Sequence, residues 1–265
     1  MSAITPSKIP DARPGGLGEY NLAGKVAVIT GGSSGIGAAT ARRLAAGGAT
    51  IWVGYNTGAD RAAALVAEFP GSGHRTLYLP MADSAAIARA AEVVRSAHGH
   101  VDVLVNSAGV TRAVAHADLD ALDDTLFDKV MITNVRGPFA TVRAFRSLLK
   151  ASGDAIIINI SSLAGVSGQG SSIVYGASKA ALDVMGMSLA RALGPEIRVI
   201  GISPAAVATD FVPGRGRDVV ERAGATAPLQ VVTEPDDIAL AVVGAIVYLR
   251  QTTGTSILVD AGKHL

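Results

Sequence analysis

Apolar residues along the chain gather in short runs, separated by stretches in which apolar positions recur at helical spacing. The run at 155–160 reads Ala-Ile-Ile-Ile-Asn-Ile, so nearly every position is apolar. A strand of this kind is typical of a parallel sheet that is covered on both faces. Similar short runs, rich in β-branched residues, predict seven strands in all, at 25–30, 50–54, 76–79, 102–106, 155–160, 198–202 and 256–259.

Helices are predicted between these strands. The periodic stretches lie after the first strand as far as Leu44, and at 85–97, 123–130, 139–150, 175–193 and from about residue 235. Regular alternation of strand and helix favours a doubly wound α/β fold, with a parallel sheet between two layers of helices. Ligands of such folds bind at the carboxyl ends of the strands.

Length and composition fit one domain. The 265 residues include no compositional break, and the proline- and glycine-rich start predicts a tail at 1–20 before a domain at 21–265. Lys and Arg number 23 against 22 Asp and Glu, so no basic block indicates nucleic acid. The longest apolar run, Ile238 to Leu249, is too short to span a membrane, and no signal-peptide core is present. The absence of cysteine is compatible with the reducing cytoplasm, where we expect the protein to reside.

The turn after the first strand is rich in glycine and serine, reading Thr-Gly-Gly-Ser-Ser-Gly-Ile-Gly at 30–37. Glycines there let the backbone approach a pyrophosphate, and the free amides of the following helix favour an anion. The predicted cofactor contacts in this turn are Gly31, Ser33, Ser34, Gly35, Ile36 and Gly37.

The end of the second strand reads Tyr55-Asn56-Thr57 and lacks the acid that would bind a ribose 2′-hydroxyl. We therefore favour NADP(H) over NAD(H). Ser33, Ser34, Asn56 and Arg61 are the expected phosphate contacts.

Tyr175 and Lys179 stand four residues apart on the predicted helix 175–193, and therefore on one face of it. A nearby cation favours the phenolate and lowers the pKa of a tyrosine, which would let it donate or accept a proton. By itself such a pair is also an ordinary feature of a helix surface.

These motifs together resemble those of the short-chain dehydrogenase/reductase family, over nearly the whole chain from Leu22 to Gly262. Besides the glycine turn and the Tyr-x-x-x-Lys pair, the resemblance rests on the Asn-Ser-Ala-Gly element at 106–109. It also rests on Ser162, thirteen residues before Tyr175, and on Asn134.

The resemblance implies a Rossmann fold and a catalytic tetrad. Tyr175 would be the proton donor or acceptor, and Ser162 would bind the substrate oxygen. Lys179 would bind the nicotinamide ribose and lower the tyrosine pKa, while Asn134 would hold a water in a proton relay. Cofactor contacts are further expected at Tyr55, Asn56, Met81, Asn106, Ala108, Gly109, Pro204, Val207 and Thr209, besides Tyr175 and Lys179.

Four positions depart from the family pattern. Pro80 stands where an adenine-binding aspartate is common, so contacts to adenine would fall on the backbone near Met81. The others are Ser107, Ala205 and Ala261, which replace an asparagine and two glycines. They bear on cofactor affinity more than on chemistry.

The stretch from Ala206 to about Val232 is expected to form a mobile lid over the substrate, with Phe211, Val212 and Arg215 as possible pocket residues. Arg215, Arg217 and Arg222 could contact an anionic group, although we interpret them as solvated loop charges. Asp183 and Arg191, on the helix of Tyr175, are interpreted as solvated or interface charges. The five histidines show no ligand pairing, so no metal is expected.

The predicted function is hydride transfer between NAD(P)(H) and a secondary alcohol or ketone. The leading substrate classes are 3-oxoacyl thioesters and sugar or polyol ketones, which the sequence does not separate. By resemblance the protein would be a homotetramer, or else a homodimer. Two alternatives stay open: a non-catalytic nucleotide-binding protein on the same fold, and another reaction on the same scaffold, such as epimerisation or enoyl reduction.

Overall fold

The computed structural model describes residues 20–265, so residues 1–19 of the predicted tail at 1–20 lie outside this part. Tyr20, which the sequence analysis placed in the tail, belongs to the folded domain. Its hydroxyl donates to the carbonyl of Arg43 at 2.7 Å, and its ring lies against Gly47.

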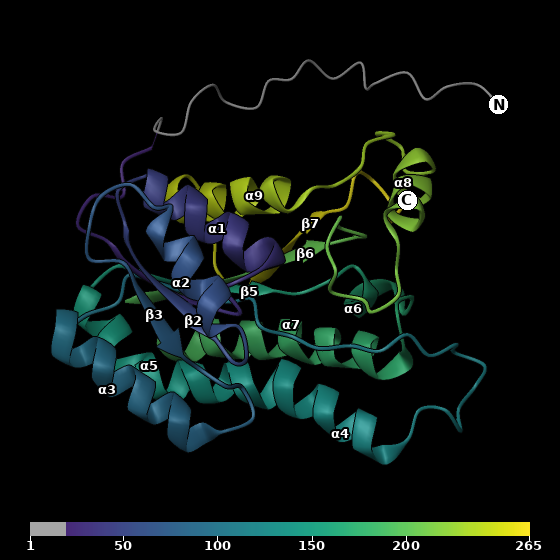
Figure 1. The fold of residues 1–265 in the computed structure, drawn as a ribbon, viewed down its shortest axis with the longest axis horizontal. Helices are drawn as coiled ribbons and strands as arrows, with labels where there is room; N and C mark the ends of the chain where they lie inside the picture. The colour runs from purple at the N-terminus through teal and green to yellow at the C-terminus, as the bar shows by residue number, and fades with distance from the viewer. Residues whose placement is uncertain (1–19) are drawn as a thin grey trace.

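A single parallel sheet forms the centre of the molecule, as predicted (Figure 1). Its seven strands run in the order β3-β2-β1-β4-β5-β6-β7. The bounds of the strands are β1 Val26–Thr30, β2 Thr50–Tyr55, β3 Arg75–Tyr78, β4 Val103–Asn106, β5 Ala155–Ile160, β6 Ile197–Pro204 and β7 Thr255–Val259. All seven sequence-predicted strands are present, with ends shifted by at most two residues.

Helices cover both faces of the sheet (Figure 1). One layer holds α1 (Gly35–Ala46), α2 (Ala59–Ala67) and α9 (Pro235–Val247). The other holds α3 (Ser84–His98), α5 (Gly137–Ser152) and α7 (Ile173–Leu193), with α4 (Asp124–Met131) beside it. Strand residues alternate between the two cores: Ala27 and Ile29 pack toward α1 and α9, whereas Val26 and Val28 pack toward α3 and α5.

Three helices and one helical turn were not predicted. They are α2, α6 (Ala164–Ser167), α8 (Arg217–Ala225) and a π-helical turn, η1 (Ile132–Arg136), between α4 and α5. Helix α2 buries only Ala62 and Leu65, so its apolar pattern is too short to recognise. Helix α8 lies inside the predicted lid and buries only Val220 and Gly224.

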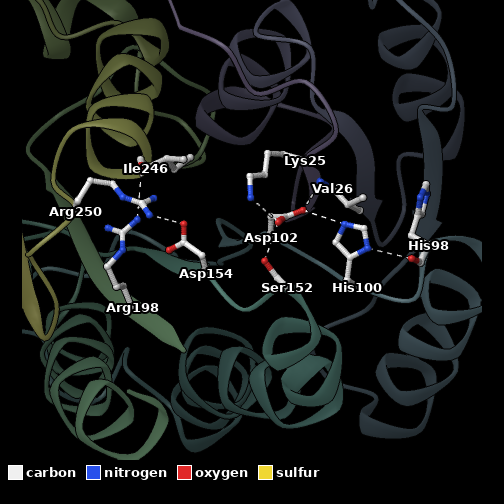
Figure 2. Close-up of polar contacts among 10 residues, drawn as sticks. All are labelled: Lys25, Val26, His98, His100, Asp102, Ser152, Asp154, Arg198, Ile246 and Arg250. Carbon is white, nitrogen blue, oxygen red and sulfur yellow. Dashed lines mark hydrogen bonds and ion pairs between the residues drawn. The ribbon is translucent and has the colours of Figure 1, made fainter. Parts of the chain in front are cut away.

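The amino edge of the sheet, where the strands begin, carries a buried polar cluster around Asp102 (Figure 2). Its carboxylate accepts hydrogen bonds from the Lys25 ammonium at 2.9 Å, the Val26 amide at 2.8 Å and the Ser152 hydroxyl at 2.7 Å. His100 lies 3.3 Å away. Burial acts to raise the pKa of Asp102, but these hydrogen bonds outweigh it and the pKa is lowered.

Arg198 forms a second polar cluster at the same edge. Its guanidinium donates to the carbonyls of Ala245, Ile246 and Leu249 at the end of α9, at 2.9 to 3.2 Å. Arg250 pairs with Asp154 beside it (Figure 2). Both clusters join the start of a strand to the end of a helix. They thereby hold strands and helices in place at the edge of the sheet opposite the carboxyl ends of the strands.

Candidate active site

A cleft of about 1600 Å³ opens at the carboxyl edge of the sheet, where the strands end. Loops after β1, β2, β4, β5 and β6 line it. The strand order reverses between β1 and β4, and a crevice outside the strand ends at such a point is where doubly wound folds bind ligands. The volume exceeds the ~300–1000 Å³ of ordinary small-molecule sites, so it can hold a dinucleotide together with a substrate.

The glycine turn forms one wall of this cleft and leads into α1. Ser34 precedes the helix, and no side chain caps its first turn, which contains no acidic residue. The first amides of α1 are therefore uncapped, and Gly35 and Ile36 at this end of the helix line the cleft, as a pyrophosphate site would require. A side chain at Gly31 would meet the Ala108 backbone at 2.8 Å, so only glycine lets the two loops approach this closely. These features fit a dinucleotide cofactor.

The far end of the cleft lies beyond β2, where Tyr55, Asn56 and Thr57 line it without an acid. Arg61, at the start of α2, directs its guanidinium over Gly58, and Ser33 approaches the same point. Arg61 is exposed and forms no ion pair within residues 20–265. Arg42, which the sequence analysis missed, also lines this end but is bonded to Glu68 at 2.8 Å. A 2′-phosphate therefore finds one unpaired arginine here.

The adenine side of the cleft is lined by the backbone region of residues 80–83, including Met81. Asp83 does not substitute for the missing adenine acid. Its carboxylate accepts hydrogen bonds from the amides of Ala85 and Ala86 and so caps α3.

Asn106, at the end of β4, does not line the cleft. It is buried and its amide donates to the Asn159 side chain at 2.9 Å, in register on the neighbouring strand β5. Gly37 is likewise absent from the lining, because it packs against the Gly31 backbone. These two predicted cofactor contacts instead shape the strand ends and the glycine turn. The other fifteen predicted contacts line the cleft: Gly31, Ser33, Ser34, Gly35, Ile36, Tyr55, Asn56, Met81, Ala108, Gly109, Tyr175, Lys179, Pro204, Val207 and Thr209.

Tyr175 and Lys179 lie on the cleft face of α7. Ser172 caps this helix by accepting a hydrogen bond from the Tyr175 amide, so the tyrosine stands in the first turn. The Lys179 ammonium donates to the Ile160 carbonyl at 2.7 Å and lies 5.7 Å from the centre of the Tyr175 ring. One carbonyl thus occupies one of its three hydrogens.

Ser162 follows the end of β5 and faces the same cleft. Its hydroxyl oxygen accepts a hydrogen bond from the Ala164 amide at 3.1 Å, at the start of α6. This contact uses the oxygen as an acceptor and leaves the hydroxyl hydrogen to be donated. Tyr175, Lys179 and Ser162, separated in the sequence, therefore meet at one place.

The pKa of Tyr175 is raised, contrary to the expectation that Lys179 would lower it. Burial of the phenol is the main cause, and the Ser162 hydroxyl and the Arg215 charge oppose it. Burial also lowers the pKa of Lys179 to about 8, opposed by the negative charge of Asp183. The Lys179 ammonium is bonded to the Ile160 carbonyl and lies over the face of the Tyr175 ring, and it forms no hydrogen bond with the phenol oxygen.

Asn134 lies in η1, outside the lining of the cleft. Its side chain accepts from the Val110 amide at 2.9 Å, and donates to the Val110 carbonyl at 3.0 Å and to the Ser178 hydroxyl at 3.1 Å. Both amide hydrogens are therefore used within the protein. Asn134 thus links the loop after β4 to α7, where its partner Ser178 directly precedes Lys179. π-Helical turns often occur at functional sites.

Asp183 lies one turn beyond Lys179 on α7, and both its carboxylate oxygens are buried. It packs under Gly165 of α6. Burial raises its pKa, opposed by the hydroxyls of Ser161 and Ser256 and by Lys179. The interpretation of Asp183 as a solvated charge is therefore wrong, because its carboxylate oxygens are buried within the chain. The i, i+4 spacing from Lys179 is the sequence signal that could have found it.

The lid joins β6 to α9 and contributes Phe211 and Arg215 to the cleft. The rings of Phe211 and Tyr175 are 5.8 Å apart, and Thr209 approaches Gly35 at the start of α1. Arg217 and Arg222 lie exposed on α8 and pair with acids, as surface charges do. Arg215 differs: it is partly buried in the cleft, so interpreting it as a solvated loop charge was wrong.

Comparison with known proteins gives a consistent result. The model of the short chain dehydrogenase family matches residues 25–219. This chain belongs to that family. L-Rhamnose 1-dehydrogenase (NAD(P)(+)) of Azotobacter vinelandii is 37% identical over 260 residues, which cover 91% of this chain and 97% of the relative. The 3-oxoacyl-acyl-carrier-protein reductase of Escherichia coli is 32% identical over 251 residues, covering 92% of this chain and 99% of the relative.

Solved structures agree with this assignment. A short chain dehydrogenase from Burkholderia cenocepacia, crystallised in complex with NADP, has a TM-score of 0.84 and 34% identity, covering 93% of this chain and all of that one. This short-chain dehydrogenase is thus an NAD(P)-dependent oxidoreductase that acts on CH–OH groups. Within residues 20–265, no helix is both long and apolar enough to cross a lipid bilayer.

Proposed function

We propose that the protein interconverts a ketone and a secondary alcohol with NADP(H), and that Tyr175 transfers the proton at the substrate oxygen. The observation that carries this proposal is the convergence of Tyr175, Ser162 and Lys179 in the cleft that also contains the uncapped start of α1. A bound nicotinamide cofactor would supply or accept the hydride.

Each side chain has a role that its contacts allow. Ser162 donates its free hydroxyl hydrogen to the substrate oxygen, where negative charge develops during reduction. Tyr175 is protonated at neutral pH, as an ordinary phenol is, and burial raises its pKa further, so it is the acid for ketone reduction. Lys179 keeps two hydrogens for the cofactor ribose after bonding to the Ile160 carbonyl. Asn134 holds the Val110 loop against α7 and thereby positions the wall of the site.

NADP(H) is favoured over NAD(H) because the end of β2 lacks an acid and Arg61 is free to meet a 2′-phosphate. The relatives do not narrow the substrate, since one is named for a sugar and another for a 3-oxoacyl thioester. Both belong to the two substrate classes that the sequence analysis favoured. We further propose that the protein is a homotetramer, which sedimentation would test. We also propose that it acts in the cytoplasm, which cell fractionation would test.

The experiment is a fluorescence titration with NADPH and NADH, followed by turnover assays with the preferred cofactor on 3-oxoacyl thioesters, ketoses and simple ketones. Tight NADPH binding with turnover supports the proposal. Tight binding with no turnover of any ketone would favour the non-catalytic nucleotide-binding alternative. Absence of binding would overturn the cofactor assignment.

A further inference from the structure

Arg215 is a cleft residue that neither the cofactor nor the tetrad accounts for. It stands between β6 and α8, two residues before the exposed Arg217. One of its terminal nitrogens donates to the Val207 carbonyl at 2.8 Å, while its Nε is buried without a hydrogen-bond partner. Four of the five guanidinium hydrogens are therefore not bonded within residues 20–265.

Arg215 also has no counter-charge within residues 20–265. Arg217 pairs with Glu221 at 3.1 Å and with Glu234 at 2.8 Å, and Arg222 pairs with Asp218 at 2.7 Å. None of the acids that line the cleft forms an ion pair with Arg215. Glu68 bonds Arg42, Asp83 caps α3, Asp260 bonds His264, and Asp210 is exposed and forms no ion pair with Arg215.

The guanidinium is held in place by a fixed part of the backbone. Val207 is buried and bridges to Thr233, and the neighbouring Ala208 amide donates to the Thr233 carbonyl at 3.0 Å. Arg215 therefore has a firm anchor, although it belongs to the lid. A partly buried cation without a counter-charge is unfavourable by itself, and its cost falls when an anion pairs with it.

The position of Arg215 relates it to the reacting atoms. Burial raises the pKa of the Tyr175 phenol, and the Ser162 hydroxyl and, to a smaller extent, the Arg215 charge oppose this rise. Burial in turn lowers the pKa of Arg215, opposed by Tyr175. Arg215 and Tyr175 line the same cleft, and the ring of Phe211, four residues before Arg215 in the lid, lies 5.8 Å from the Tyr175 ring, so the free guanidinium hydrogens share the space in which a substrate must meet Tyr175.

We propose that Arg215 binds a carboxylate of the substrate and makes the enzyme selective for oxo- and hydroxycarboxylic acids. A guanidinium matches a carboxylate by two parallel hydrogen bonds, which also fixes the substrate's orientation. A single free arginine offers one positive charge, which suits a carboxylate better than a phosphate dianion. This inference rests on the proposed ketone and alcohol chemistry of the same cleft.

The test compares an acid with its neutral ester. Levulinate and methyl levulinate are reduced with NADPH by the wild type, by Arg215→Met and by Arg217→Met as the matched lid control. The wild type should prefer levulinate. Arg215→Met should lower kcat/KM for levulinate by about 10–100-fold, as expected for a lost hydrogen bond to a charged group, and change the ester by less than about threefold. Arg217→Met should leave kcat/KM unchanged for both levulinate and methyl levulinate.

A second measurement does not depend on turnover. Benzoate and benzamide are titrated by calorimetry into each protein saturated with NADP⁺. Benzoate should bind more tightly than benzamide to the wild type, and this difference should disappear in Arg215→Met but persist in Arg217→Met. Arg215→Lys, which keeps the charge but loses the planar fork, should retain part of it. Thermal unfolding checks that each variant is folded.

The outcomes separate this inference from the proposed function. If neutral ketones are reduced but Arg215→Met leaves acid and ester selectivity unchanged, the carboxylate role is wrong and the reductase stands. If benzoate binding depends on Arg215 but no ketone turns over, the reductase is wrong and the carboxylate site stands. An equal loss for acid and ester would assign Arg215 to the Tyr175 phenol and overturn the inference. So would a loss of NADPH affinity as large as the loss for benzoate.

Discussion

The two edges of the sheet treat their buried charges differently. At the amino edge, Asp102 is surrounded by three hydrogen-bond donors and a histidine, and Arg198 bonds three helix carbonyls. At the carboxyl edge, Lys179 and Arg215 each bond a single backbone carbonyl. The amino edge uses its polar groups to hold the fold, whereas the carboxyl edge leaves donors free for ligands.

The contrast shows why buried charge alone does not identify a site. Asp102 is as buried as Lys179, but its contacts form a closed network. Removing one member of such a network is costly because the remaining groups stay buried without partners. Free donors at the carboxyl edge impose a similar cost on the fold, which a ligand offsets when it binds. Substitutions at the amino edge should therefore affect stability, and those at the carboxyl edge should affect activity.

The largest expected effect is that of Tyr175→Phe. It removes the phenol oxygen but keeps the ring against Phe211, so kcat should fall by about 10²–10⁴-fold, the range typical of lost acid-base catalysis. NADPH affinity, measured by fluorescence titration, should change little. If the variant kept most of its activity, the proposed acid-base role of Tyr175 would be wrong.

Asp102→Asn should produce the opposite result, with normal kcat per folded molecule and a lower free energy of unfolding. We expect a loss of about 2–4 kcal/mol at pH 7, measured by urea denaturation, because an amide cannot bind the lysine as a carboxylate does.

The pH dependence of this loss has a defined sign. The folded pKa of Asp102 is lowered, so its stabilising contribution is present above the unfolded value of ~3.9 and disappears as the pH falls through the lower folded value. The difference between wild type and Asp102→Asn should therefore narrow below about pH 4. A difference that stayed constant from pH 7 to pH 3 would contradict the charged role of Asp102.

Asp183→Asn should act mainly on the pH profile of kcat/KM, with a smaller effect on the free energy of unfolding. The Asp183 charge opposes the lowering of the Lys179 pKa to about 8, so its removal should let that pKa fall further. Lys179 would then lose its proton at lower pH, and the alkaline limb of kcat/KM should move to lower pH. The rate at pH 9 should fall by about 3–10-fold, with a smaller change at pH 6. Asp128→Asn, at an exposed position on α4, is the control and should leave the profile unchanged. An unshifted limb in Asp183→Asn would mean that its charge does not reach Lys179.

Comparable or smaller effects are expected for two exposed arginines, one at each edge. Arg61→Met should weaken NADPH by about tenfold and leave NADH nearly unchanged, since it removes a hydrogen-bonding charge at the expected 2′-phosphate. Arg250→Met breaks the exposed pair with Asp154 and should cost below about 1 kcal/mol of stability without changing cofactor affinity. Equal weakening of NADPH and NADH by Arg61→Met would argue against phosphate recognition.

The sequence predicted the sheet well because buried parallel strands are apolar at nearly every position. The run at 155–160 became β5 with the same bounds. Short or weakly apolar helices gave no such signal. Helix α8 is stabilised by ion pairs between its own side chains and lies within a glycine-, proline- and arginine-rich stretch. The π-helical turn η1 follows α4 directly, and its sequence has the apolar spacing of an ordinary helix.

Predicted site residues that belong to local motifs mostly line the cleft, whereas contacts between distant segments gave no signal in the sequence. Ser162, Tyr175, Lys179 and most of the glycine turn follow from short patterns and line one cleft, whereas Gly37 packs against the Gly31 backbone. Asn106 was expected at the cofactor but turns to Asn159, because the register of β4 and β5 places the two amides side by side. Ala261, where the family resemblance predicts glycine, adopts a left-handed φ of 56°, a conformation that is uncommon for a residue with a side chain.

The sequence by itself determined the order of strands and helices, the glycine turn and the family resemblance, because each depends on residues close together in the chain. Only the tertiary structure decided which charges are satisfied. Arg215 and Arg217 are two residues apart and alike in sequence. Arg217 pairs with acids on the surface, whereas Arg215 lines the same cleft as Tyr175 and forms no ion pair among residues 20–265. Burial and the positions of distant partners set that difference, and neither is encoded in a local pattern.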